Sequence, residues 1–400
     1  MISVEEARAR ILGGLTPTGP ETVPLAAGWN RVLARPVAAR LTQPPADVSA
    51  MDGYAVRAAD AAEGAALRLS GAAPAGRPFA GSVAPGEAVR IFTGGFVPEG
   101  ADAILLQEDA TPTEGGVRVN ETVTLGRHIR RRGLDFAEGA VLLPAGRRLT
   151  ARDIGLAAAG NHPWLTVQRR PRIGILATGD EIALPGEALP EGGIVSSNAH
   201  ALAALVASGG GEASILPIAP DDPAEIAALA GSGGFDLLVT TGGASVGEHD
   251  LVQKALGRDG FVLDFWRIAM RPGKPLIWGR LGAVPVLGLP GNPVSALVCA
   301  VIFLLPALAR LQGLADTAIP TLRALAGADL PENDKRADHL RASLVQSEAG
   351  EWIATPAARQ DSSMLAVLAG ADALLLRPPF APKLAKGGAV EIIPLAALRV

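Results

Sequence analysis

Cysteine is almost missing from this chain, since Cys299 is the only one among 400 residues. A disulfide framework within the chain and a cysteine-rich zinc site are therefore excluded, and the composition fits a reducing compartment. The five histidines, at positions 128, 162, 200, 249 and 339, do not show the spacing of metal ligands. The first six residues lack the basic and then apolar order of a signal peptide, so we expect a cytoplasmic protein.

Aromatic side chains and excess charge are also scarce. Aromatic residues make up 4% of the chain and all hydrophobic residues 48%, so the cores must consist mainly of Ala, Leu, Val and Ile. A net charge of -4 argues against a nucleic-acid partner. The longest apolar run, residues 294–309, is short for a membrane span and contains Pro306. We interpret it as a core helix and expect no membrane contact.

What the chain does have is three glycine-bearing loops, each directly after a short buried-strand pattern. The loops are residues 177–181, 241–250 and 289–295, and the strand patterns are residues 173–177, 237–240 and 284–287. Ligand crevices of open α/β sheets lie beyond the carboxyl ends of such strands. Glycine lets backbone amides approach an anion, and carboxylates in the same loops can hold a divalent metal. The pattern predicts a phosphorylated ligand that is held by backbone and metal together.

Around these loops the pattern divides the chain into domains. Residues 1 to about 40 have a helical pattern with a capping box at Ser3 and Glu6, and Thr150 caps a second helix that ends near residue 159. Short strands and turns fill the segment from 47 to about 120, strands alternate with helices from 172 to about 311, and short strands return after 313. We therefore predict an α/β plus β multidomain fold, whose central parallel sheet is covered on both faces. The expected domains are a helical and linking domain (1–46 with 134–170), a small β domain (47–133), an α/β domain (171–313) and a β-rich C-terminal domain (314–400).

Carboxylates cluster in or beside the predicted strand-end loops. Asp180 and Glu181 follow the first strand, Asp221 and Asp222 precede a helix, and Asp250 closes the second loop. Turn chemistry explains a Gly-Asp pair equally well, one of the two aspartates at 221–222 fits as an N-cap, and Asp250 could cap a helix over 251–256. Because the loops converge at one sheet edge, however, several carboxylates there would repel one another without a cation. The pattern favours a magnesium site beside phosphates.

Another segment of the chain, the basic segment of residues 267–275, carries positive instead of negative charge. Arg267, Arg271 and Lys274 surround a turn that Pro272 and Pro275 stiffen. A solvated basic loop is the alternative, but two prolines around Lys274 favour a defined geometry and therefore anion binding. Neither a nucleophilic triad, a P-loop nor a dinucleotide fingerprint is visible.

Seven segments resemble one family closely and in order. They are residues 49–55, 90–94, 129–135, 177–181, 242–248, 271–275 and 289–295. Together they are similar to the molybdopterin molybdenumtransferases, the family of bacterial MoeA and the gephyrin E domain. The resemblance implies an elongated four-domain homodimer, in which the pterin-binding domain of one subunit faces the β-rich domains of the other. It implies that molybdate and Mg²⁺ act on adenylated molybdopterin, with release of AMP. The adenylyltransferase of the preceding step and recipient molybdoenzymes are candidate partners.

The resemblance also implies roles for individual residues. Positions linked to activity are Asp52, Thr93, Asp135, Glu181, Asp221 and Asp250, of which Glu181, Asp221 and Asp250 are the expected metal ligands. The expected ligand-binding residues are Gly242, Gly243, Ser245, Gly247, Arg267, Arg271, Lys274, Pro275, Pro290, Asn292, Pro293, Arg341 and Ser362. The family commonly has lysine at positions 267 and 271, so the fork of arginine could alter oxyanion geometry. Leu134 and Ala46 also depart from the family pattern, which has an acidic and an aromatic residue there.

Two alternatives remain open at this point. A molybdopterin adenylyltransferase would share the Thr-Gly-Gly loop and a fold like that of residues 172–311, but such enzymes are usually small single domains. A non-catalytic cofactor-binding scaffold is the other alternative, and the lack of a disordered linker argues against it. Release of AMP from adenylated molybdopterin distinguishes the three functions.

Overall fold

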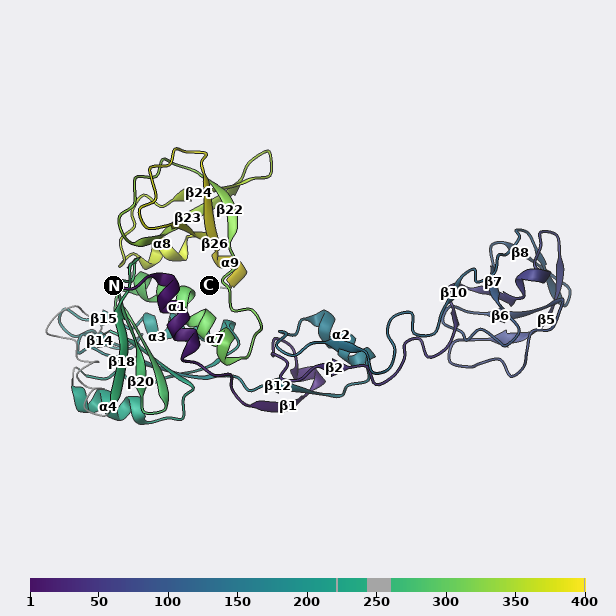
Figure 1. Ribbon diagram of the computed structural model, residues 1–400, viewed down its shortest axis with the longest axis horizontal. Coiled ribbons are helices and arrows are strands. Elements are labelled where there is room, and N and C mark those ends of the chain that lie inside the picture. The colour runs from purple at the N-terminus through teal and green to yellow at the C-terminus, as the bar shows by residue number, and fades with distance from the viewer. Residues whose placement is uncertain (221, 243–259, 399) are drawn as a thin grey trace.

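The computed structural model describes residues 1–220, 222–242, 260–398 and 400. The chain forms an elongated molecule with a compact part at one end and two smaller lobes extending from it (Figure 1). The compact part contains the α/β domain and a C-terminal lobe, and both ends of the chain lie there. The chain leaves it after the first helix, passes through a linking lobe to a distal β lobe, and returns through the linking lobe.

The α/β domain is built on a six-stranded sheet with the order β16-β13-β17-β21-β20-β18. Its strands are β13 (Arg172–Ala177), β16 (Glu212–Ile215), β17 (Leu237–Thr241), β18 (Phe261–Arg267), β20 (Pro275–Leu281) and β21 (Val284–Leu289). The first four in the spatial order are parallel, β20 is antiparallel to β21, and β18 is antiparallel to β20. The prediction of a parallel sheet is therefore wrong for β20. The connection between β20 and β21 is a short hairpin, which only antiparallel strands can use.

Helices cover both faces of this sheet. On one face lie α1 (Val4–Gly13), α3 (Asn198–Ser208) and a long helix made of α6 (Pro293–Cys299), a π-helical turn (Ala300–Leu304) and α7 (Leu305–Leu311), whose apolar side chains form the largest core. On the other face α4 (Pro223–Gly231) packs its Ile226 and Ala230 against the sheet. Residues 293–311 are long and apolar enough to cross a membrane, but 78% of the apolar window is buried inside the protein. The predicted core helix is confirmed. The π turn ends two residues before Pro306, which lacks the amide hydrogen that a regular helical hydrogen bond needs.

The N-terminal helix is much shorter than its predicted extent to residue 40. It ends at Gly13 because Gly14, Pro17 and Pro20 follow, and neither residue type continues a helix well. Residues 20–24 instead form β1 (Pro20–Pro24), which pairs with β12 (Trp164–Gln168). The cap at Ser3 is present, since its hydroxyl accepts a hydrogen bond from the Glu6 amide at 3.0 Å. By its contacts, α1 belongs to the core of the α/β domain.

The linking lobe is small and its core is formed by its own elements. Besides the pair β1 and β12 it contains β2 (Val37–Ala38), β11 (Val141–Leu143), the short helix Leu25–Ala27 and α2 (Ala151–Ala159). The predicted cap of α2 is confirmed, because Thr150 and Asp153 form a capping box. The Thr150 amide donates to Asp153 Oδ2 at 2.8 Å.

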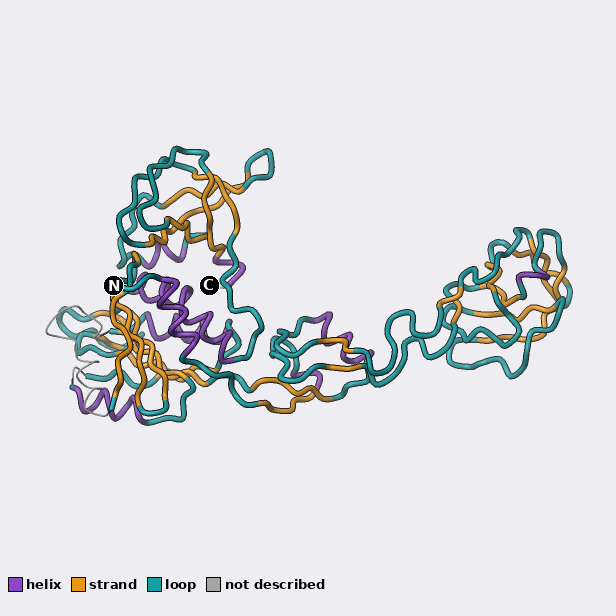
Figure 2. The backbone as a smooth tube through the Cα atoms, viewed as in Figure 1, coloured by secondary structure: helices purple, strands orange, loops and turns teal. Residues whose placement is uncertain are grey.

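The distal lobe consists of strands and loops with one short helical turn, as Figure 2 shows. Its sheet has the order β7-β4-β6-β5-β9-β8. The strands are β4 (Gly53–Val56), β5 (Ala66–Ala73), β6 (Glu87–Ile91), β7 (Ala103–Leu106), β8 (Ala110–Thr113) and β9 (Gly116–Val119), with β3 (Val48–Ser49) paired to β10 (Ile129–Arg130) where the chain enters and leaves.

The C-terminal lobe contains a third six-stranded sheet, with the order β19-β23-β24-β22-β26-β25. Its elements are β19 (Met270–Arg271), β22 (Leu322–Ala326), β23 (Ala337–Gln346), β24 (Trp352–Pro356), β25 (Ala373–Arg377), β26 (Ala389–Pro394), α8 (Leu365–Ala369) and α9 (Leu395–Leu398). Since β19 comes from the chain between two α/β strands, it connects this lobe to the α/β domain. The short strands predicted after residue 313 are present.

Candidate functional site

A cavity of about 730 Å³ lies at the carboxyl ends of β13, β17 and β21. It receives residues from each of the three glycine-bearing loops and from the C-terminal lobe. Its lining includes Thr178, Gly179, Glu181, Asn198, Thr241, Gly242, Pro275, Pro290, Gly291, Asn292, Pro293, Ser295 and Ser363. The structure therefore brings together six residues that the sequence singled out: Glu181, Gly242, Pro275, Pro290, Asn292 and Pro293. The position agrees with the rule that α/β ligands bind beyond the carboxyl ends of strands.

Glycine is required where two of these loops approach each other. Gly242 has φ +96°, and a Cβ atom there would lie 2.4 Å from the carbonyl oxygen of Thr178. Gly179 also lies in the region of positive φ, at +144°. A larger residue at Gly242 would force the two loops apart, whereas a Cβ atom at Gly179 would lie 2.4 Å from Glu181 Oε2 and displace that side chain.

Asn198 connects two of the three loops. Its Nδ2 donates to Thr241 Oγ1 at 2.8 Å and to the carbonyl oxygen of Gly291 at 2.7 Å. Its Oδ1 and the hydroxyl of Thr178 are buried without a hydrogen-bond partner within the part of the chain that the structure describes. Buried polar atoms without partners are rare in proteins, which fits a polar ligand in this cavity. Sequence reasoning missed Asn198, because its position at a helix start indicated only a cap.

The three cationic side chains of the basic segment lie in different surroundings. Lys274 is exposed and directly precedes Pro275, which lines the cavity. Arg267 stacks on Trp266, with its guanidinium 3.7 Å from the ring centroid. Arg271 is turned toward the C-terminal lobe, where its Nε donates to Asp338 Oδ1 at 2.8 Å. The structure therefore does not bring Arg267 and Arg271 to the cavity lining.

A buried arginine lies behind the wall that the C-terminal lobe contributes. Arg341 is 1% exposed, its Nη2 donates to the carbonyl oxygen of Asp361 at 3.1 Å, and its Nε has no partner among the described residues. Burial lowers the pKa of Arg341, and the nearby charge of Asp361 opposes this shift. Next to Asp361, Ser362 Oγ accepts from Asn292 Nδ2 at 2.9 Å. The two residues predicted here, Arg341 and Ser362, are thus tied to the edge of the cavity.

The predicted metal ligands are only partly described. Glu181 lines the cavity and is exposed. Asp221 and Asp250, together with Gly243, Ser245 and Gly247, lie outside the described residues. Asp222 is the N-cap of α4, since its Oδ1 accepts from the amides of Ala224 and Glu225. Within the described ranges no group of three or more His, Cys, Asp or Glu side chains could hold a metal ion, so the magnesium site stays a prediction.

Three further predicted residues lie in or beside the distal lobe. Asp52 and Thr93 are in direct contact, because the Thr93 amide and hydroxyl donate to Asp52 Oδ1 at 2.7 and 2.8 Å. These two hydrogen bonds, together with the charge of Arg90, hold the pKa of Asp52 below its usual range. Asp135 lines a separate hollow of about 450 Å³. The distal lobe lies at the opposite end of the molecule from the α/β domain (Figure 1), so these residues do not reach the cavity within one chain.

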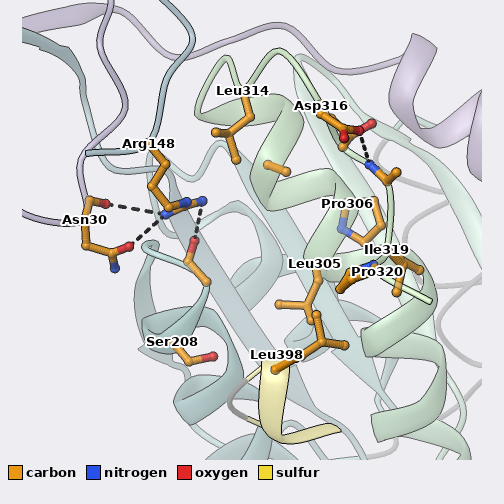
Figure 3. A pocket seen from close by; sticks show the side chains of 15 residues that line it. Asn30, Arg148, Ser208, Leu305, Pro306, Leu314, Asp316, Ile319, Pro320 and Leu398 are labelled. Carbon is orange, nitrogen blue, oxygen red and sulfur yellow. Dashed lines mark hydrogen bonds between the residues drawn. The ribbon is translucent and has the colours of Figure 1, made fainter. Parts of the chain in front are cut away.

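Another cavity, of about 350 Å³, lies where the linking lobe meets the α/β domain (Figure 3). Arg148 of the linking lobe donates to Asn30 Oδ1 at 3.2 Å, to Gln312 Oε1 at 3.3 Å and to the carbonyl oxygen of Gly209 at 3.4 Å. Gln312 follows α7 and Gly209 follows α3. Arg148 therefore connects the linking lobe to the ends of two helices of the α/β domain.

The chain is similar to known proteins over most of its length. Family models match residues 2–160 (MoeA N-terminal region, domains I and II), 174–310 (probable molybdopterin binding domain) and 323–395 (MoeA C-terminal region, domain IV). The chain is 36% identical to the molybdopterin molybdenumtransferase of Haemophilus influenzae, with 88% of each chain covered. It is also 36% identical to molybdopterin molybdenumtransferase 2 of Mycobacterium tuberculosis, with 98% of this chain and 99% of that one covered. A crystal structure of the molybdopterin biosynthesis MoeA protein from Pyrococcus horikoshii has a TM-score of 0.85 at 27% identity, with 98% and 99% covered.

The fold and the cavity define a multidomain protein built around an α/β domain of the molybdopterin-binding type, with β-rich lobes on both sides. The chain belongs to the MoeA family, the molybdopterin molybdenumtransferases. The family resemblance seen in the sequence is confirmed, and so is the α/β plus β multidomain fold.

Proposed function

We propose that this protein is a cytoplasmic molybdopterin molybdotransferase, which inserts molybdenum from molybdate into adenylated molybdopterin and releases AMP. The observation that carries the proposal is the cavity at the strand ends. It belongs to the domain matched as a probable molybdopterin binding domain, and residues that the family resemblance singles out converge on it. Membership of the family supports the enzymatic role.

The cavity suits a large ligand with a phosphoanhydride. Its volume of about 730 Å³ is within the range of ordinary small-molecule sites. Backbone at Gly242 can approach phosphate oxygens, since glycine carries no side chain that would shield its amide. The unpartnered Thr178 hydroxyl and Asn198 Oδ1 offer hydrogen bonds to polar edges of the pterin or adenine.

Molybdate is the proposed second substrate, and the basic side chains near the cavity are its proposed ligands. The buried guanidinium of Arg341 has an unused donor at Nε, and Lys274 adds an exposed charge beside Pro275. A tetrahedral dianion would satisfy both, because charge-assisted hydrogen bonds to oxyanions are the stronger kind. Ser362, held by Asn292, would orient the same oxyanion.

Magnesium is the proposed metal, with Glu181, Asp221 and Asp250 as its ligands. Carboxylate oxygens are what Mg²⁺ prefers, and a bound ion would neutralise phosphate charge beside the anhydride. Within the described part of the site, Glu181 supplies one such carboxylate at the cavity wall.

A homodimer is the proposed assembly. Asp52, Thr93 and Asp135 lie in or next to a lobe at the far end of the molecule (Figure 1), yet the family resemblance connects them to the same reaction. If the distal lobe of one subunit meets the cavity of the other, all of the proposed residues form one site.

The experiment that tests the proposal measures AMP release from purified adenylated molybdopterin with and without molybdate. We expect release that depends on molybdate. We further expect Lys274→Ala to raise the molybdate concentration for half-maximal rate by about tenfold or more, since a charge-assisted hydrogen bond contributes ~1.5–3 kcal/mol. Lys383→Ala, which removes an exposed lysine of the C-terminal lobe, is the matched control and should leave that concentration unchanged. Formation of adenylated molybdopterin from ATP, without AMP release, would instead identify an adenylyltransferase.

A further inference from the structure

An arginine, Arg90, lies beside Asp52 in the distal lobe, and its contacts go beyond the effect of its charge on that carboxylate. We infer that Arg90 is a positioning residue for Asp52, which holds this carboxylate and its loop in the orientation that the reaction requires. The inference rests on the proposed function, because that function gives Asp52 its role. Three sets of contacts join Arg90 to two aromatic rings, to the backbone and to the loop after β7.

The guanidinium of Arg90 is held between two aromatic rings. Its central carbon lies 5.0 Å from the centroid of Tyr54 on β4 and 5.0 Å from that of Phe92, which follows β6. Tyr54 and Arg90 are also direct partners in the antiparallel register of β4 and β6. Cations within about 6 Å of a ring centroid are attracted to it. Both rings therefore attract the guanidinium, and Tyr54, the only tyrosine of the chain, helps to hold it in place.

Hydrogen bonds connect the guanidinium of Arg90 to the peptide that carries Asp52. Arg90 Nη1 donates to the carbonyl oxygen of Gly53 at 3.0 Å, and Nη2 donates to Gln107 Oε1 at 2.7 Å. The amide of Gln107 in turn donates to the carbonyl oxygen of Asp52 at 3.2 Å. Arg90 therefore fixes the Asp52–Gly53 segment directly through Gly53 and indirectly through Gln107.

The local backbone leaves little freedom for any other arrangement. A Cβ atom on Gly53 would lie 2.0 Å from the carbonyl oxygen of Leu105 on β7, so only glycine fits between the strands here. On its other side Asp52 accepts both hydrogen bonds from Thr93 through Oδ1 alone. Oδ2 has no hydrogen-bond partner among the described residues, and it is the oxygen that remains for a substrate or a partner subunit.

Charge complements the geometry. Among the described residues, Arg90 is the charged side chain whose field acts on Asp52, while Thr93 supplies its hydrogen bonds. Both effects lower the pKa of Asp52. A lysine at position 90 would keep the charge but could not make two divergent hydrogen bonds or lie flat between two rings. Charge and position can therefore be separated by substitution.

The test compares Arg90→Ala, Arg90→Lys and a control, Arg68→Ala, which removes an arginine of the same sheet that pairs with Glu87. We expect kcat for AMP release to fall by about tenfold or more in both Arg90 variants, with the KM for molybdate unchanged, because the cavity is built by other residues. Arg68→Ala should keep the wild-type kcat. Recovery of the full kcat by Arg90→Lys would show that charge alone matters and would overturn the positioning role, as would an unchanged kcat in Arg90→Ala.

A second measurement keeps this inference separate from the proposed function. The pKa of Asp52 is followed by NMR in protein with ¹³C-labelled aspartate carboxyls, and Asp52→Asn assigns the signal. Removing the adjacent cation and freeing the loop should raise this pKa in Arg90→Ala, while Arg68→Ala should leave it unchanged. The same pKa in wild type and Arg90→Ala would refute the link between Arg90 and Asp52. An inactive wild-type protein with a raised pKa in Arg90→Ala would instead refute the proposed function and leave that link intact.

Discussion

Burial changes the pKa of single ionisable side chains in this protein, and His339 is the clearest example. It lies on β23, is 5% exposed and has an Nδ1 atom without a hydrogen-bond partner among the described residues. Burial lowers the pKa of His339 to about 4. The imidazole is therefore neutral in the folded protein at pH values where the unfolded chain would already be protonated.

This shift predicts how stability depends on pH. Between about pH 6.5 and 4 the unfolded state binds the extra proton, so the folded state loses stability as the pH falls through this window. The loss is on the order of 3 kcal/mol when the pH has reached the folded pKa. Urea unfolding at a series of pH values should show this loss in wild type and a smaller one in His339→Gln. His200→Gln, which changes an exposed histidine, should behave as wild type; equal pH profiles for His339→Gln and wild type would contradict the prediction.

Sequence reasoning singled out several residues that line the cavity, but not their contacts. Glu181 was expected because it follows a strand pattern, whereas Gly242, Pro275 and Asn292 were expected from the family resemblance. The pairing of Arg271 with Asp338 was not predictable, since 67 residues separate them and they meet only through the docking of two lobes. Asn198 was missed for a related reason: both of its partners lie on other loops.

Among the elements, helix α2 depends most visibly on its cap. Asp153 is 3% exposed, accepts from the Thr150 amide and hydroxyl at 2.8 Å each and forms an ion pair with Arg147 at 2.9 Å. Burial by itself would raise the pKa of Asp153, but the hydrogen bonds from Thr150 and Arg147 outweigh it and lower the pKa. The carboxylate is thus ionised and satisfies donors at the helix start.

Removal of this cap should loosen α2. We expect Asp153→Ala to destabilise the helix by about 1–2 kcal/mol, the usual range for a lost cap. Amide hydrogen exchange over residues 151–159 reports this locally and should be faster in the variant by roughly fivefold to thirtyfold. Arg152→Ala changes an exposed residue of the same turn and is the control. If exchange in Asp153→Ala were as slow as in the control, the cap would not stabilise the helix.

Elements were predicted well wherever one local signal determines them. The strands at 173–177, 237–240 and 284–287 were visible as apolar runs before glycine loops, and α2 and α4 were visible through Thr150 and Asp222. The antiparallel pair β18 and β20 was not recognised, because β18 is a partly exposed edge strand whose apolar run is interrupted by Asp264. The N-terminal helix was predicted too long because its apolar spacing outweighed the breaks at Gly14 and Pro17.

The whole molecule is too extended to complete the proposed site within one chain, and this predicts complementation between subunits. Asp52→Ala and Glu181→Gln should each be inactive alone. Mixed dimers, formed with subunit exchange verified by labelled chains, should regain activity, because one of the two sites then has both wild-type groups. A mixture of Asp52→Ala with the double variant Asp52→Ala/Glu181→Gln is the matched control and should stay inactive. Confirmed exchange without recovery would place both residues in one subunit's site.

The domain boundaries and the dimer remain predictions at this scale. Contacts assign α1 to the α/β core although the chain then runs through the linking lobe, an arrangement that local sequence patterns do not reveal. The order of the lobes along the chain was nevertheless predicted, since segments of short strands and turns alternate with a segment in which strands alternate with helices.

The central claim is that the cavity at the ends of β13, β17 and β21 is where adenylated molybdopterin reacts. The most direct test is the rate of molybdate-dependent AMP release by Glu181→Gln, compared with that of Glu191→Gln, an exposed glutamate outside the cavity lining. Glu181→Gln keeps the size of the side chain and removes only the charge. We predict a loss of about a hundredfold or more in kcat for Glu181→Gln and a wild-type rate for Glu191→Gln. A wild-type rate in Glu181→Gln at limiting magnesium would contradict the claim.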